Sequence, residues 1–263
     1  MTANVLNKLF GQCVPLVILS FCLSACNDVE RSKMKYQQTV NRHFVYKVSK
    51  AKDTVNIDAD WVKPAWQDIP AIELKNWMGH SEPHERPQTK VKLLYDDDYI
   101  YVIFQVEERY IKCVRTKRQS DVHRDSCVEF FFTPKSGIES GYFNLEINCG
   151  GTMLFRYRNA AGEKHDIESN DCDKIKLAHS MPAVIPIEII SPTVWTLEYR
   201  IPIATLGKYL PADKPSPGVK WRANFYKCAG DSSHPHYMTW AQIDYPIPNF
   251  HLPQFFGTLE FGK

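Results

Sequence analysis

The sequence has no excess of charge of either sign, no C-x-x-C pair and no internal repeat. Its 32 basic residues nearly balance its 30 acidic residues, and this balance argues against a nucleic-acid-binding surface. Because the cysteines are widely spaced, zinc-ribbon and thioredoxin-like motifs have no support. Almost no stretch keeps a helical period, which argues against an α-helical domain. The chain is nevertheless long enough for one domain with a sizeable core.

The N-terminus has the pattern of a bacterial lipoprotein signal. Lys8 supplies a positive charge, residues 14–23 form an apolar stretch too short to span a bilayer as a helix, and residues 23–26 read as a lipobox. We therefore expect a lipoprotein signal peptide over residues 1–25 and a lipid on Cys26, which would tether the chain to a membrane. The alternative is an ordinary secretory signal followed by an incidental cysteine.

A polar, charged stretch follows this signal. We expect residues 26–46 to be a flexible tether and residues 47–263 to be one folded domain. Asp28 and Glu30 follow the cysteine as acidic residues do in surface-exported lipoproteins of Bacteroidetes, so the chain resembles a lipid-anchored protein of the cell envelope. The surface and the periplasmic face of the outer membrane both stay open.

The cysteines of the expected domain form an odd set in a compartment that permits disulfides, so at least one is unpaired or pairs outside the chain. They are Cys113, Cys127, Cys149, Cys172 and Cys228.

Short runs of β-branched and aromatic residues, bounded by Asp, Pro, Gly and Asn, predict an all-β fold built as an antiparallel β-sandwich. Residues 89–94 and 99–106 flank an acidic turn and predict a hairpin. One helical turn is expected at residues 204–209. Further strands are expected at residues 127–133, 142–148, 153–158, 185–190, 193–201, 221–228 and 257–261. Three tryptophans in or beside apolar runs are expected in the core: Trp66, Trp195 and Trp221.

Polar side chains alternate with apolar ones in the strand expected at residues 142–148. Asn144, Glu146 and Asn148 therefore share one face, about 6.6 Å apart, a spacing that suits neighbouring hydroxyls of a sugar ring. Glu129 alternates in the same way in the preceding strand and joins Glu146 if the two strands pair. A solvated outer sheet face is the plainer alternative. Two nearby acids are also the catalytic pair of a glycosidase, whose carboxyls lie about 5 to 9.5 Å apart.

Aromatic, imidazole and amine side chains gather in residues 224–253. Rings that stack on the apolar face of a sugar, beside polar groups that fix its orientation, suit a saccharide site. Simple loop packing is an alternative. A metal site is another, although the spacing of the histidines matches no standard pattern. The histidines concerned are His234, His236 and His251.

A series of short motifs runs along residues 54–263. They are, in chain order, Ile57-Asp58 and Ala65-Trp66, residues 93–96 and 99–102, residues 125–131, residues 144–148, residues 195–202, Asn224-Phe225, Trp240, and Phe250-His251 leading to Phe256-Gly257. No single motif is specific. Their order and spacing together resemble the family 9 carbohydrate-binding modules.

The resemblance implies an antiparallel β-sandwich of jelly-roll-like, DOMON-like form with structural calcium and no organic cofactor. It also implies a saccharide site between two aromatic rings. The binding glutamate of the family falls on Glu129, and two hydrogen-bonding positions fall on Glu146 and Asn148. The motifs do not assign the calcium ligands.

The two stacking positions of the family fall on His123 and Phe250, where the xylanase-linked module has two tryptophans. A His and Phe pair offers less π surface than two Trp. We therefore expect either a different ligand or a contribution from Tyr226 and Trp240.

These observations predict a non-catalytic envelope lipoprotein that captures oligosaccharide or polysaccharide and supports its catabolism beside glycoside hydrolases. One alternative is a glycoside hydrolase or its accessory subunit. Another is an electron-transfer sandwich domain that holds haem through methionine and histidine ligands. The methionines that keep the haem alternative open are Met153, Met181 and Met238.

Overall fold

The computed structural model describes residues 44–79 and 82–263. The expected signal peptide, the lipidated Cys26 and most of the expected tether lie outside the described residues. The first described strand, β1 (Val45–Lys50), includes the last two positions of the expected tether. Within the two described stretches, no helix is long and apolar enough to cross a membrane.

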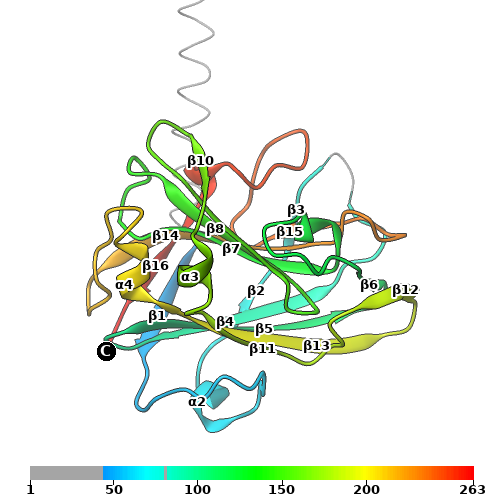
Figure 1. Ribbon diagram of the computed structural model, residues 1–263, viewed down its shortest axis with the longest axis horizontal. Helices are drawn as coiled ribbons and strands as arrows, with labels where there is room; N and C mark the ends of the chain where they lie inside the picture. Colours follow the sequence, from blue (N-terminus) through cyan, green and yellow to red (C-terminus); the bar gives the residue numbers. More distant parts are fainter. Residues whose placement is uncertain (1–43, 80–81) are drawn as a thin grey trace, which may run out of the picture.

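The strands form two facing layers (Figure 1). The first layer contains, in spatial order, β10 (Lys164–Asp166), β9 (Met153–Arg158), β8 (Tyr142–Asn148), β7 (Cys127–Thr133), β14 (Lys220–Cys228) and β16 (Gly257–Phe261). The second layer contains β4 (Gln88–Tyr95), β5 (Tyr99–Glu108), β13 (Thr193–Pro202) and β11 (Lys176–His179). Neighbouring strands within each of these two series are antiparallel. The predicted antiparallel β-sandwich is confirmed.

Strand β1 joins the two layers. Its first part pairs in parallel with β16, with Val45 opposite Thr258. Its last two residues pair in parallel with β4, with Lys50 opposite Tyr95. The first and the last strand of the described chain are therefore hydrogen-bonded neighbours.

Short elements complete the fold. They are α2 (Pro64–Gln67), β2 (Ile72–Glu73), β3 (Asn76–Trp77), β6 (Ile111–Cys113), the 3-10 turn η1 (Val122–Arg124), α3 (Ser169–Cys172), β12 (Ile185–Ile189), α4 (Ile203–Leu206), β15 (Tyr237–Thr239) and the 3-10 turn η2 (Pro253–Phe255). β6 and β12 pair as a separate two-stranded sheet, whereas β15 and β3 extend the first layer from β14.

The predicted hairpin of residues 89–106 is confirmed as β4 and β5. Its turn forms because Asp96 Oδ1 accepts hydrogen bonds from the backbone amides of Asp98 and Tyr99 at 2.8 and 2.7 Å. Aspartate side chains favour such turns because they reproduce a backbone hydrogen bond. Tyr101 donates its hydroxyl to the other oxygen of Asp96 at 2.6 Å, which connects the turn to β5.

The alternation of side chains along β7 decides which groups face the core and which face outward. Phe130 and Phe132 face the core between the two layers, and Phe130 stacks on Phe225 of the neighbouring strand β14 with ring centroids 4.8 Å apart. Glu129 and Phe131 consequently lie on the outer face of the first layer. The expected core tryptophans are all fully buried: Trp66, Trp195 and Trp221.

Candidate functional site

A pocket of about 200 Å³ lies on the outer face of the first layer. Strands β7, β8 and β14 form its floor, and η1 and the loop after β15 form its walls. The residues that line it are His123, Glu129, Phe131, Glu146, Cys228, Tyr237, Pro248, Asn249, Phe250 and His251. Four of the expected binding residues thus come together: His123, Glu129, Glu146 and Phe250.

Glu129 and Glu146 lie directly opposite each other on β7 and β8. Because opposed residues of an antiparallel pair point to the same side, both carboxyl groups belong to one floor. They are only 2% and 5% exposed, and Asn144 beside them is 1% exposed. The alternative of a solvated sheet face is therefore wrong.

Burial controls the protonation of Glu129. Desolvation raises the pKa of its carboxyl well above the ordinary value, and the neighbouring Cys228 and Glu146 act in the same direction. The Cys228 thiol donates a hydrogen bond to Glu129 Oε1 at 3.0 Å. A carboxyl that keeps its proton can both donate and accept hydrogen bonds.

Glu146 has one oxygen without a partner. Asn144 Nδ2 donates to Oε1 at 2.9 Å. The other oxygen, Oε2, is buried and accepts no hydrogen bond from the described residues, and His123 Nδ1 lies 3.6 Å from it. A buried acceptor left unpaired costs about 1–3 kcal/mol, so a hydroxyl placed in the pocket would be stabilised there.

An aromatic wall stands beside this floor. Phe250 stacks on Tyr226 with ring centroids 4.1 Å apart and planes inclined by 10°. Tyr226 is fully buried, and its hydroxyl donates to the Phe250 carbonyl at 3.3 Å. The structure therefore gives Tyr226 the role of holding Phe250 in place. His123, whose side chain is 45% exposed, lines the pocket as well.

Besides Tyr226, two further expected binding residues do not line the pocket: Asn148 and Trp240. Asn148 is fully buried, and its amide donates to the Arg115 carbonyl and to Asp125 while its oxygen accepts from the Thr152 amide. Trp240 packs edge-on against Phe44 in the core, with ring centroids 6.1 Å apart. For both residues a structural role replaces the expected contact with a saccharide.

Three residues line the pocket without having been indicated as binding residues by the sequence motifs: Phe131, Tyr237 and Cys228. Phe131 follows Glu129 by two positions in β7, so the alternation already placed it on the same face. Cys228 reaches the pocket only through the register between β14 and β7.

The alternative of a histidine metal site is not supported by the described residues, because the three histidines have separate contacts. His234 stacks on Tyr110, His236 is buried beside Lys227, and His251 bonds to Tyr142. In the described part of the chain, one group of possible ligands has its atoms within 4.8 Å of one another: Cys127, Glu129 and Cys228.

Two ligand-like clusters in the described residues do not suit the structural calcium that the family resemblance implies. Calcium takes six to eight oxygen ligands, whereas the close group at the pocket floor contains two thiols. Oxygens do converge near α2, but the ammonium of Lys63 already bonds to Asp58 and Glu198 there, both at 2.7 Å. The Asn56 carbonyl accepts from the same ammonium. A protein cation thus takes the place that a metal would need.

His251 gives the fold a pH dependence. Burial, reinforced by the nearby Arg158, lowers the pKa of its imidazole from the ordinary value of 6.5 to about 4. Below pH 6.5 the unfolded chain binds a proton that the folded chain rejects, so stability falls as the pH drops toward 4. Between pH 7 and pH 4 we expect the wild type to lose about 3 kcal/mol more unfolding free energy than His251→Gln, measured by urea denaturation. Parallel pH curves for the two proteins would contradict this expectation.

The chain matches a known protein family over most of its length. The sequence profile of carbohydrate-binding family 9 matches residues 54–261. The chain belongs to carbohydrate-binding family 9. This assignment confirms the resemblance inferred from the motifs, over nearly the same residues.

Solved structures agree with the family 9 assignment. A protein from Bacteroides uniformis, described provisionally as carbohydrate-binding, has a TM-score of 0.73 at 25% identity, over 82% of this chain and 98% of that chain. A family 9 module from Caldicellulosiruptor kristjanssonii in complex with glucose has a TM-score of 0.54 at 15% identity, over 82% and 95% of the two chains. The same organism's module in complex with cellotriose has a TM-score of 0.54 at 16% identity, over 82% and 93%. The comparison with curated proteins returned no match.

Proposed function

We propose that this family 9 domain binds a saccharide, without hydrolysing it, in the pocket above Glu129 and Glu146. The observation that carries the proposal is the buried, unpartnered Oε2 of Glu146 at the pocket floor. A sugar hydroxyl supplies the missing donor. The protonated carboxyl of Glu129 can donate to one sugar oxygen and accept from a hydroxyl.

The wall of the pocket suits the apolar face of a sugar. The C–H groups of a pyranose pack on the ring of Phe250, which its stacking on Tyr226 holds fixed before a ligand arrives. The pocket of about 200 Å³ is smaller than the roughly 300–1,000 Å³ of sites for drug-sized ligands. We therefore propose that it takes one sugar unit of an oligosaccharide or polysaccharide. The glucose and cellotriose bound by the two family 9 modules support this class of ligand.

The arrangement of the two acids favours binding over hydrolysis. In a glycosidase the two carboxyl groups flank the scissile bond, one on each side. Here Glu129 and Glu146 are cross-strand partners that rise from the same floor. Both would therefore contact a ligand from below.

We further propose that a lipid on Cys26 holds the domain at the cell envelope, where it retains oligosaccharides for glycoside hydrolases. The lipobox pattern before Cys26 supports this role. Release of a Cys26→Ser variant from the membrane fraction would support the anchor, and unchanged membrane association would contradict it.

Calorimetry of the purified chain with glucose, cellotriose and a panel of other oligosaccharides tests the binding function. We expect a saturable ligand whose affinity falls about tenfold in Phe250→Ala, because the variant removes the stacking ring. Tyr245→Ala is the matched control, since Tyr245 lies in the same loop but does not line the pocket. Absence of binding to every saccharide tested, or release of reducing sugar, would contradict the proposal.

A further inference from the structure

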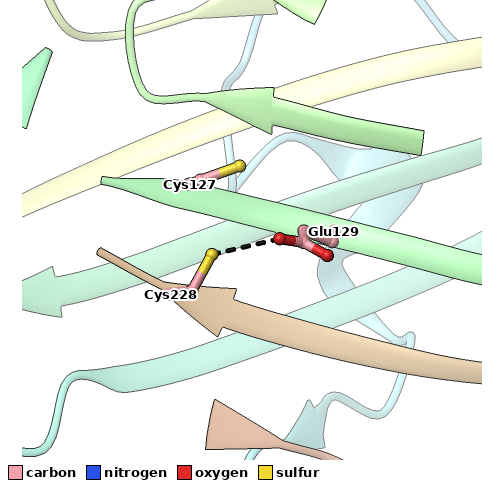
Figure 2. A group of neighbouring side chains, drawn as sticks. All are labelled: Cys127, Glu129 and Cys228. Carbon is pink, nitrogen blue, oxygen red and sulfur yellow. Dashed lines mark hydrogen bonds between the residues drawn. The ribbon is translucent and has the colours of Figure 1, made fainter. Parts of the chain in front are cut away.

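Two cysteines meet at the floor of the pocket. Cys127 begins β7, Cys228 ends β14, and the two residues are direct partners in the antiparallel ladder between these strands. Figure 2 shows them on neighbouring strands beside Glu129, with the Cys228 thiol bonded to the carboxyl group. Both side chains are buried, and Cys228 lines the pocket.

The positions of the two residues suit a disulfide. Directly opposed residues of an antiparallel pair have Cα atoms about 4.5 to 5.5 Å apart, and disulfides span about 4.4 to 6.8 Å. Their side chains point to the same face of the sheet, and the two sulfur atoms lie within 4.8 Å of each other. Rotation about the Cα–Cβ bonds would bring the sulfurs together.

A soft metal ion is the competing occupant of this position. Zinc sites normally have four ligands, whereas the described residues supply three here. The missing fourth ligand favours the disulfide.

We propose that Cys127 and Cys228 form a redox pair beneath the saccharide pocket, and that closing their disulfide frees Glu129 to bind the ligand. In the reduced chain the Cys228 thiol occupies Glu129 Oε1. The disulfide has no S–H donor, so this oxygen becomes available to a sugar hydroxyl. The effect on affinity rests on the proposed saccharide function, whereas formation of the disulfide does not.

The oxidant that the proposal requires is a small disulfide such as glutathione disulfide. The Cys228 sulfur, deprotonated, attacks one sulfur of the oxidant and expels a thiolate, which leaves a mixed disulfide. The Cys127 sulfur then attacks the Cys228 sulfur and expels the second thiolate. Two S–H bonds are lost and one S–S bond forms in the protein. The two electrons and two protons end on the two thiols derived from the oxidant.

The other cysteines of the described residues provide internal controls. Cys113 and Cys149 are a second buried pair in contact, but neither lines the pocket. Cys172 follows Asp171 in α3 and belongs to neither pair. An oxidised chain should therefore leave the thiol of Cys172 free.

Disulfide mapping tests the first half of the proposal. The purified full chain is incubated with glutathione disulfide at pH 8.5, alkylated, digested without reduction and analysed by mass spectrometry. We expect a peptide pair linked through Cys127 and Cys228, and alkylated Cys172. The proposal would be overturned if Cys127 and Cys228 stayed reduced after prolonged oxidation of the folded chain. It would also be overturned if the chain resisted oxidation because stoichiometric zinc protected these two cysteines.

Calorimetry with the best saccharide ligand tests the second half. The oxidised chain should bind about fivefold more tightly than the reduced chain, the scale of one neutral hydrogen bond. Cys127→Ala should lose this response to oxidant, and Cys172→Ala, which removes one buried thiol elsewhere, should keep it. Circular dichroism confirms that each variant is folded. Equal affinities in the two redox states would overturn the proposed effect of the disulfide on saccharide binding. A mapped disulfide in a chain that binds no saccharide would support the redox pair of Cys127 and Cys228 and contradict the binding function.

Discussion

Replacing Glu146 with alanine is expected to weaken saccharide binding about 30-fold. The variant removes the buried oxygen that awaits a donor at the pocket floor, and with it a hydrogen bond to a carboxyl group. Such a bond contributes about 2 kcal/mol, which corresponds to this change in the dissociation constant. Calorimetric titration of wild type and variant with the same oligosaccharide measures the effect.

The matched control for this experiment is Glu163→Ala. Glu163 is an exposed carboxylate between β9 and β10 and does not line the pocket. It should leave the dissociation constant unchanged. If a folded Glu146→Ala protein bound the saccharide as tightly as the wild type, the result would contradict the proposed saccharide site.

Replacing Glu108 with leucine is expected to lower the unfolding free energy by about 4 kcal/mol. Glu108 ends β5 in one layer, and Oε2 lies 2.9 Å from the ammonium of Lys227, which is fully buried in β14 of the other layer. Its other oxygen accepts from Trp195 Nε1 at 2.8 Å. Removing one partner of a buried ion pair leaves an uncompensated charge and costs about 3–5 kcal/mol. Urea denaturation at pH 7 measures the loss.

A double variant separates the contribution of the Glu108–Lys227 ion pair to the unfolding free energy from the other effects of replacing Glu108. Glu108→Leu combined with Lys227→Met leaves neither charge in the core, so it should be more stable than Glu108→Leu alone by about 2 kcal/mol. The single variant Lys227→Met should also be destabilised, because it strands the Glu108 carboxylate. Additive losses in the double variant would show that the two charges do not stabilise each other.

The interior strands of the first layer were predictable with accurate bounds. Residues 127–133, 142–148, 153–158 and 257–261 coincide with β7, β8, β9 and β16. Their apolar residues recur with period two between turn residues, which is a local signal. Strands β6, β10 and β11 were not predicted, because each is three or four residues long and β10 is fully exposed. Such strands depend on the neighbour they pair with more than on their own sequence.

The site was predictable in part for the same reason. Local alternation placed Glu129 and Glu146 outward, and the family resemblance added His123 and Phe250. Asn148 shares the alternation, yet it lies at the end of β8, where its side-chain oxygen accepts a hydrogen bond from the Thr152 amide of the turn that follows. The contacts of Cys127 with Cys228 and of Lys227 with Glu108 link strands far apart in the chain, and no local pattern indicates them.

Strand β1 also determines how the domain bears tension. A pull on the chain before Val45 runs along β1, and the parallel hydrogen bonds to β16 and β4 resist it together rather than opening one at a time. A polysaccharide gripped on the outer face would exert its drag through the first layer, which contains β16. A pull between the start of β1 and a ligand on the outer face of the first layer would therefore load these strands in shear.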